Sequence, residues 1–264
     1  MSRLQQLFAR KPDEVLNIYC TAGFPEQDST IPIMQALQEN GADIIELGIP
    51  YSDPLADGPV IQESGSIALA NGMSIKVLFR QLNGMRDQQS EYAAKIDIPV
   101  ILMGYLNPVL QYGFEKFCAD ASAAGVDGLI LPDLPMREFE TAYGPVLKKY
   151  GLDFIFLVTP ETSEERIRKI DNLSSGFIYA VSSSSTTGKD KNFDDVEAYL
   201  QRLQSLQLKN PVLVGFGIKD RTTFASACKY TNGAIIGSAY IKALQQGGND
   251  IRKTTKSFLE NILQ

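Results

Sequence analysis

The most informative absence in this sequence is histidine, which does not occur once among its 264 residues. Without histidine the chain can form neither a Ser-His nor a Cys-His nucleophile pair, and no metal can be held through imidazole. We expect no metal site, and any acid or base chemistry must come from other side chains. Carboxylates are the first candidates.

Basic residues are outnumbered by acidic ones. Lys and Arg number 25 against 31 Asp and Glu, which gives a net charge of −6, and no basic run occurs. This balance argues against a nucleic-acid-binding surface. The chain also has no apolar segment long enough to span a membrane, and its first residues, MSRLQQLFARKPDEVLN, lack the apolar stretch of a signal peptide.

Cysteine is rare and odd in number, with Cys20, Cys118 and Cys228 far apart in the sequence. This spacing is typical of reduced thiols rather than of a disulfide framework, so we expect a cytoplasmic protein. A hydrophobic content of 44% and a charged content of 21% are ordinary for a soluble globular chain.

Eight short apolar segments alternate with helical patterns along the chain. The expected strands are residues 16–22, 43–48, 99–103, 128–131, 153–158, 176–181, 211–215 and 233–236. This alternation predicts an α/β fold, a (β/α)8 TIM barrel. Extra helices are expected at the N-terminus, over residues 2–9, and after the second strand, over 60–70 and 74–92. Because no shift in composition marks a boundary, residues 1–264 are expected to form one catalytic domain.

Three later parts of the chain complete this prediction. The segment GYLNP after the third strand is expected to be a loop before a helix at 117–124. The eighth strand is expected to end at Gly237-Ser238, and a helix at 251–263 closes the chain.

The stretch DIIELGIPYSDPLADG, residues 43–58, concentrates acidic groups at the end of the second strand. Side chains alternate along a strand, so Ile44, Glu46 and Gly48 share one face. If that face points into the barrel, Glu46 lies near the C-terminal end of its strand, with Asp53 and Asp57 on the loop that follows. Two acids in different environments suit general acid and base catalysis. The alternative is a structural Glu46 and two ordinary turn-forming aspartates.

Three glycine-bearing turns follow the last three strands, at Thr187-Gly188, at residues 215–217 and at Gly237-Ser238. Glycine lets backbone N–H groups approach an anion, and a following helix N-terminus adds a favourable dipole. Barrels commonly hold a phosphate in the last two of these loops, so a phosphate site is predicted there. The long Ser-, Thr- and Gly-rich segment 182–193 indicates either a lid or an ordinary surface loop.

The residues leave few reactions for a phosphorylated substrate. None of the eight strand segments contains lysine, which argues against a Schiff-base aldolase inside the barrel. The turn GFGIKD lacks the third glycine of a dinucleotide fingerprint. What remains is proton transfer by carboxylates, either in an isomerisation or in a carbon–carbon cleavage whose substrate is its own electron sink.

The motif ELGIPYSDPLADGPVIQ closely resembles the signature of the tryptophan synthase alpha subunit family. NIYCTAGFP, ILMGYLNPV, GLILPDLP, VSSSSTTG, VGFGI and IIGSA resemble the successive strand-end motifs of that family, in order, over essentially the whole chain. The resemblance implies a lyase that cleaves indole-3-glycerol phosphate to indole and glyceraldehyde 3-phosphate for L-tryptophan biosynthesis. It implies no cofactor in this chain, because pyridoxal phosphate (PLP) would belong to a partner beta subunit in an alpha2beta2 heterotetramer.

The resemblance also implies roles for single residues. Glu46 and Asp57 would be catalytic, with Glu46 moving protons and Asp57 accepting the indole N–H. The substrate would be bound by Tyr179, Tyr19, Met103, Ile130, Pro132 and the lid residue Thr187. The phosphate would be bound by Gly188, Gly217, Gly237 and Ser238. The beta subunit would be contacted by Pro50, Asp53, Asn107 and Asp133.

Two features depart from the family pattern. The lid reads Ser185-Thr186-Thr187-Gly188 where many members have Gly-Val-Thr-Gly, and Ser183 stands where enteric members often have arginine. These differences concern lid closure and contacts between subunits. Two alternative functions stay open from the sequence: a different phosphosugar isomerase or lyase on the same barrel, and a non-catalytic subunit that only activates its partner.

Overall fold

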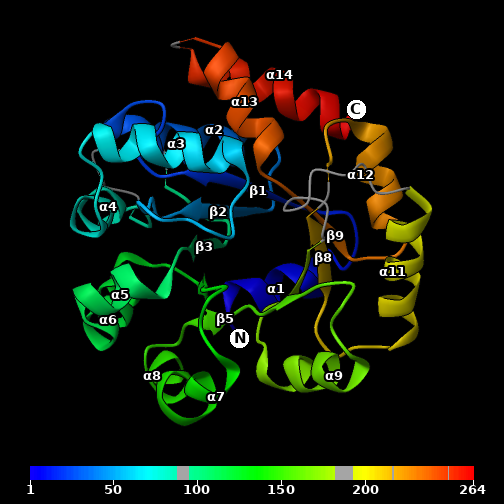
Figure 1. Ribbon diagram of the computed structural model, residues 1–264. Helices are drawn as coiled ribbons and strands as arrows, with labels where there is room; N and C mark the ends of the chain where they lie inside the picture. Colours follow the sequence, from blue (N-terminus) through cyan, green and yellow to red (C-terminus); the bar gives the residue numbers. More distant parts are fainter. Residues whose placement is uncertain (88–94, 182–192, 216, 249) are drawn as a thin grey trace.

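The computed structural model of the protein describes residues 1–87, 95–181, 193–215, 217–248 and 250–264 (Figure 1). In this described part, nine parallel strands form one sheet in the order β5-β4-β3-β2-β1-β9-β8-β7-β6. The strands are β1 Val15–Thr21, β2 Ile44–Gly48, β3 Val100–Met103, β4 Gly128–Ile130, β5 Asp153–Phe154, β6 Leu157–Val158, β7 Ile178–Val181, β8 Val212–Gly215 and β9 Gly233–Ile236.

The sheet closes on itself because β5 and β6, at its two ends, are separated by only two residues. Within this gap the backbone N–H of Ile155 donates to the Leu129 carbonyl on the β4 side, at 3.0 Å. The Phe156 carbonyl accepts from the Tyr179 N–H on the β7 side, also at 3.0 Å. The predicted fifth strand, 153–158, is therefore one barrel strand with a short interruption. The prediction of a (β/α)8 barrel is confirmed.

Most helices lie around the outside of the strands in Figure 1, whereas the first helix lies across the middle of the view. The helices before β5 are α1 Arg3–Arg10, η1 Gln27–Ser29, α2 Thr30–Glu39, α3 Pro59–Ala70, α4 Ile75–Leu82, α5 Leu106–Tyr112, α6 Phe114–Ala124, α7 Met136–Glu138, η2 Phe139–Tyr143 and α8 Gly144–Lys149. Those after it are α9 Glu164–Leu173, α11 Phe193–Ser205, α12 Arg221–Cys228, α13 Ser238–Gln246 and α14 Ile251–Leu263.

Helix α1 closes the N-terminal end of the barrel. A capping box starts it, in which the Ser2 hydroxyl accepts from the Gln5 N–H and the Gln5 side chain accepts from the Ser2 N–H. Leu4 and Leu7, on one face of the helix, are buried and pack into the barrel interior. The other members of this interior cluster are Val15, Ile44, Ile101, Ile130, Ile155, Phe177, Leu213 and Ile235.

Side chains alternate between the two faces of β2, as the sequence predicts. Ile44 packs in the barrel interior, whereas Ile45 and Leu47 pack in the larger cluster between the strands and the surrounding helices. Glu46 therefore points inward, on the same face as Ile44. Since the floor below Ile44 is filled by apolar side chains, Glu46 can be reached only from the C-terminal end of the barrel.

Three helix predictions need correction. The segment GYLNP is not only a loop, because α5 begins at Leu106, where the Asp133 carboxylate accepts from the Leu106 N–H at 2.9 Å. A further helix, α13, follows Gly237 directly. The helix predicted over 74–92 ends at Leu82, and Gly84 then takes a positive φ of 76° that does not continue a helix; residues 88–94 lie outside the described part.

The packing of α1 leads to a stability prediction. Leu7→Ala should lower the free energy of unfolding by about 2–5 kcal/mol, because a cavity is left at the floor of the barrel. Leu55→Ala is the matched control, since the Leu55 side chain is 91% exposed, and it should change stability by less than about 0.5 kcal/mol. Denaturant unfolding of both variants measures this, and equal effects would contradict the assignment of α1 as the barrel floor.

Candidate active site

The centre of the candidate site is Glu46, which is fully buried on β2. Its Oε2 accepts a hydrogen bond from Asn17 Nδ2 on the neighbouring strand β1, at 2.8 Å. Its Oε1 has no hydrogen-bond partner within the described residues. A buried carboxyl group with a single neutral partner is costly to ionise.

The protonation of Glu46 reflects this environment. Burial raises the pKa of Glu46, the Asn17 hydrogen bond opposes the rise, and the negative charge of Asp57 adds to it, so that the pKa is about 8. At neutral pH the carboxyl group is therefore mostly protonated. A proton-carrying Glu46 can act first as an acid and afterwards as a base.

The second acid, Asp57, lies on the loop between β2 and α3. Burial raises its pKa, and a hydrogen bond from the Tyr105 hydroxyl opposes the rise. The same hydroxyl accepts from the Ala56 N–H at 3.0 Å, so Tyr105 holds the loop as well as the carboxylate. The Tyr105 ring packs against Tyr51, with centroids 5.3 Å apart. The sequence analysis does not single out Tyr105, although its place directly after the third strand is the position where site residues of barrels occur.

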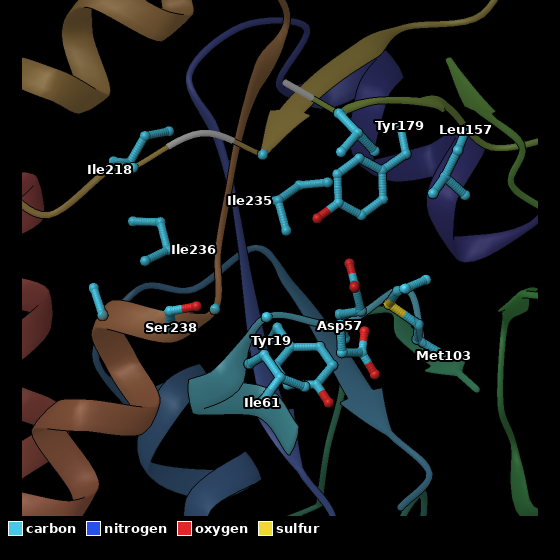
Figure 2. A pocket seen from close by; sticks show the side chains of 18 of the residues that line it. Tyr19, Asp57, Ile61, Met103, Leu157, Tyr179, Ile218, Ile235, Ile236 and Ser238 are labelled. Atoms are coloured by element: carbon cyan, nitrogen blue, oxygen red, sulfur yellow. The ribbon is translucent and has the colours of Figure 1, made fainter. Parts of the chain in front are cut away.

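Both acids line one cavity of about 600 Å³ at the C-terminal end of the barrel. Figure 2 shows Tyr179 across this cavity from Tyr19 and Asp57, with Ser238 on one side and Met103 on the other. Its remaining lining residues are Glu46, Ala56, Gly58, Ile61, Pro132, Leu157, Val181, Gly215, Gly217, Ile218, Lys219, Ile235, Ile236, Gly237, Ala239 and Lys242. The cavity is large enough for a small aromatic substrate with a phosphorylated side chain.

Five of the predicted substrate residues fall in the described part of the chain. Tyr19, Met103, Pro132 and Tyr179 line the cavity. Ile130 does not: it is fully buried among the interior side chains of the barrel. The sixth, Thr187, lies outside the described residues.

The two cavity tyrosines occupy space that two glycines leave open. A Cβ atom on Gly48 would lie 2.1 Å from the Tyr19 hydroxyl oxygen, and one on Gly215 would lie 2.6 Å from the Tyr179 hydroxyl oxygen. Each tyrosine ring therefore lies over a neighbouring strand at a position where no larger residue fits. Burial raises the pKa of both hydroxyl groups well above the usual value, so both stay neutral.

Of the predicted phosphate residues, Ser238 lies on the opposite side of the cavity from Met103 (Figure 2). Gly217, Gly237 and Ser238 line it, and α13 begins at Ser238 without a side-chain cap. Uncapped N–H groups at a helix N-terminus attract anions. Lys219 and Lys242, which the sequence analysis does not single out, line the cavity as well. Gly188 lies outside the described residues.

The residues predicted to contact a partner lie close to this end of the barrel but do not line the cavity. Asp53, Asn107 and Asp133 are exposed and Pro50 is half-buried. The Asn107 side-chain amide donates to the Tyr51 hydroxyl at 3.3 Å, beside the Asp57 loop. In the described ranges no cluster of three or more acidic or cysteine residues could hold a metal ion, and no helix is long and apolar enough to cross a membrane.

Comparison with known proteins gives one consistent result. The sequence profile of the family described as "Tryptophan synthase alpha chain" matches residues 5–263. The tryptophan synthase alpha chain of Flavobacterium johnsoniae is 50% identical over 250 residues, which are 94% of this chain and 96% of that protein. That of Parabacteroides distasonis is 50% identical over 246 residues, 93% of each chain. The crystal structure of tryptophan synthase subunit alpha from Legionella pneumophila str. Paris is 34% identical, with a TM-score of 0.87 over 99% of this chain and 97% of that one.

The raised pKa of Glu46 leads to a prediction about stability. The folded protein favours the neutral form of Glu46, which both the folded and the unfolded chain adopt at low pH. As the pH rises from about 4.5, where an unfolded glutamate ionises, towards about 8, the free energy of unfolding therefore falls. Glu46→Gln removes this loss. The free energy of unfolding of this variant, relative to that of the wild type, should be about 2 kcal/mol higher at pH 7 than at pH 5.

Denaturant unfolding at the two pH values measures this difference. Glu63→Gln, an exposed position on α3, is the matched control and should show no such change between pH 5 and pH 7. A gain for Glu46→Gln that is equal at both pH values would mean that Glu46 is not held neutral by the fold.

Proposed function

This chain belongs to the tryptophan synthase alpha chain family, and from that membership we propose that Glu46 and Asp57 carry out its reaction. The chain is a lyase of tryptophan biosynthesis that cleaves indole-3-glycerol phosphate to indole and glyceraldehyde 3-phosphate. The observation that carries the proposal is that two acids of different environment, one buried and protonated and one held on a loop, line the same cavity.

Glu46 moves the proton in this proposal. Its carboxyl group first protonates carbon 3 of the indole ring, which places a positive charge on the ring. The resulting carboxylate then accepts the proton of the hydroxyl group on the adjacent glycerol carbon. As that O–H bond breaks, the carbonyl of the aldehyde forms, the carbon–carbon bond breaks, and its electron pair returns to the indole ring. The proton balance closes, so Glu46 ends as it began, and the step needs no cofactor in this chain.

Asp57 stabilises the charge that develops on the ring. As a carboxylate it accepts the indole N–H and interacts with the positive charge that protonation creates. The Tyr105 hydrogen bond supports this role in two ways, because it fixes the orientation of the carboxylate and favours its ionised form. The two acids thus act in opposite protonation states, which suits their different exposure.

Two regions of the cavity bind two different parts of the substrate. Tyr19, Met103, Pro132 and Tyr179 hold the indole ring near the acids, and Ile130 supports them from the buried layer below. The phosphate binds at the other side, where α13 begins, against the residues Gly217, Gly237 and Ser238. From the family resemblance, Gly188 completes this phosphate site and Thr187 closes over Asp57.

The family partners with a beta subunit, and we infer an alpha2beta2 heterotetramer in the cytoplasm in which PLP belongs to the beta subunit. The surface proposed for this contact comprises Pro50, Asp53, Asn107 and Asp133. Its place beside the Asp57 loop supports the proposal, as does Leu55, a large apolar side chain of that loop that is 91% exposed. Three free cysteines, two of them buried, agree with a reducing compartment.

The roles of the acids lead to an activity prediction. Glu46→Gln keeps the shape of the side chain but removes the proton carrier, so kcat for indole release should fall by about 10²–10⁴-fold. Asp57→Asn should lower it by a similar factor. Indole release from indole-3-glycerol phosphate, with and without a beta subunit, measures both variants, and Glu63→Gln should keep wild-type activity. Substantial cleavage by Glu46→Gln would sink this assignment, and a wild-type chain inert on this substrate would favour another phosphosugar reaction.

The phosphate site leads to a second prediction, tested with a matched pair at Gly237. A Cβ atom there would make ordinary contacts, 3.4 Å at the nearest, with Tyr19. Gly237→Ala therefore tests size alone, whereas Gly237→Asp adds a negative charge beside the phosphate. We expect the KM of Gly237→Asp to exceed that of Gly237→Ala by at least roughly tenfold, a loss of about 1.4 kcal/mol of binding. Equal KM values for the pair would place the phosphate elsewhere.

A further inference from the structure

In the described part of the chain, Asn17 is the one residue whose side chain forms a hydrogen bond with Glu46, and its side chain makes no other hydrogen bond there. It is fully buried on β1, and its Nδ2 donates to Glu46 Oε2 at 2.8 Å. Its own Oδ1 is buried without a partner among the described residues. A buried amide with an unsatisfied carbonyl destabilises the fold, so an apolar residue at this position would suit the interior better.

We propose that Asn17 is a positioning residue that confines the proton of Glu46 to Oε1. The proposal rests on the proposed catalytic role of Glu46. Asn17 does not line the cavity, so it does not touch the substrate and acts only through the carboxyl group it holds.

The chemistry of the Asn17 amide explains why the proton of Glu46 is confined to Oε1. The N–H group of Asn17 can only donate, so Glu46 Oε2 must present a lone pair to keep the bond. A proton on Oε2 would compete with that bond, whereas a proton on Oε1 leaves it intact. Asn17 therefore makes the two carboxyl oxygens unequal, with Oε2 anchored and Oε1 left to give and take the proton.

The other groups around Glu46 do not distinguish its two carboxyl oxygens through a hydrogen bond. Asp57, on the loop after β2, and Glu46 repel each other when both are ionised. Tyr19 and Cys20 on β1 and Tyr179 on β7 also interact electrostatically with Glu46, and burial keeps all three neutral. Lys219 and Lys242 line the same cavity, but in the described part of the chain they form neither a hydrogen bond nor an ion pair with Glu46. Asn17 thus opposes the pKa rise that burial causes, without adding a charge.

A direct titration of Glu46 in the full-length protein tests the proposal. Protein with ¹³C at the glutamate carboxyl carbons is compared with the same protein carrying Glu46→Gln, and the resonance missing from the variant is that of Glu46. In Asn17→Leu, which keeps the number and branching of the side-chain heavy atoms, the titration midpoint should move up by about one pH unit, because a hydrogen bond to the charged form is lost.

Two further variants complete the comparison. Asn17→Asp keeps the shape and should also move the midpoint upward, since two adjacent carboxyl groups resist ionising together, so it serves if Asn17→Leu does not fold. Ile44→Val is the matched control. Ile44 is the register partner of Asn17 on β2, and losing one methyl group there leaves the hydrogen bond intact and the midpoint unchanged.

The activity of the same proteins separates positioning from a structural role. Because Glu46 acts first as an acid, activity should fall as the pH rises through its pKa, and in Asn17→Leu this alkaline limb should move upward with the carboxyl midpoint. We expect kcat at neutral pH to fall by roughly tenfold and KM to stay within about twofold.

Two failures are distinguishable. A wild-type midpoint and pH profile in Asn17→Leu, together with an inactive Glu46→Gln, would overturn the role of Asn17 alone. An active Glu46→Gln would overturn the proposed role of Glu46 instead.

Discussion

The site depends on one constraint, the burial of a carboxyl group inside a closed sheet. Glu46 has no exposed surface and no charged partner of opposite sign among its hydrogen bonds in the described chain. Water is kept from it on one side by the apolar interior, which α1 seals with Leu4 and Leu7. Because desolvation penalises the charged form, the carboxyl group keeps a proton near neutral pH. The apolar packing at the N-terminal end of the barrel therefore helps to keep Glu46 protonated near the C-terminal end.

The same constraint explains why the second acid lies on a loop. A second carboxylate inside the barrel, close to Glu46, would have to share its proton, and then neither group could be a full negative charge. Asp57 avoids this because its loop is less buried and because Tyr105 favours the ionised form. The Ala56 N–H, bound to the same hydroxyl, ties the loop to the segment after β3. The rigid strand thus carries the proton, and the anchored loop carries the charge.

The sequence predicted those features that follow from local periodicity. Alternation along β2 placed Glu46 on the inner face, and all eight barrel strands were found, because each is a short apolar run between turns. Depth along the barrel was not predictable in this way. Ile130 has the right face and pairs with Met103, yet it is fully buried, because its height depends on the stagger of β4 against β3.

Partners contributed by distant segments also escaped the sequence analysis. The bond from Asn17 to Glu46 joins residues 29 apart on different strands, and the contact of Tyr105 with Ala56 on the Asp57 loop joins residues 49 apart. Helix α5 was missed because it is only seven residues long, contains Pro108 and starts on a carboxylate from another loop, Asp133. In each case the local pattern is compatible with several structures, and the choice is made by tertiary contacts.

Two unsatisfied oxygens, Asn17 Oδ1 and Glu46 Oε1, lie in a protein interior that otherwise pairs most of its polar groups. A core selected for stability alone would fill both positions with apolar residues, which the strand propensities of β1 and β2 would accept. The surrounding barrel is apolar enough to bear the loss, with Val15 and Ile44 directly below on the same two strands. Stability is thus concentrated in the lower layers of the barrel and given up at its C-terminal end, where an unpaired oxygen is the group that can exchange a proton with a substrate.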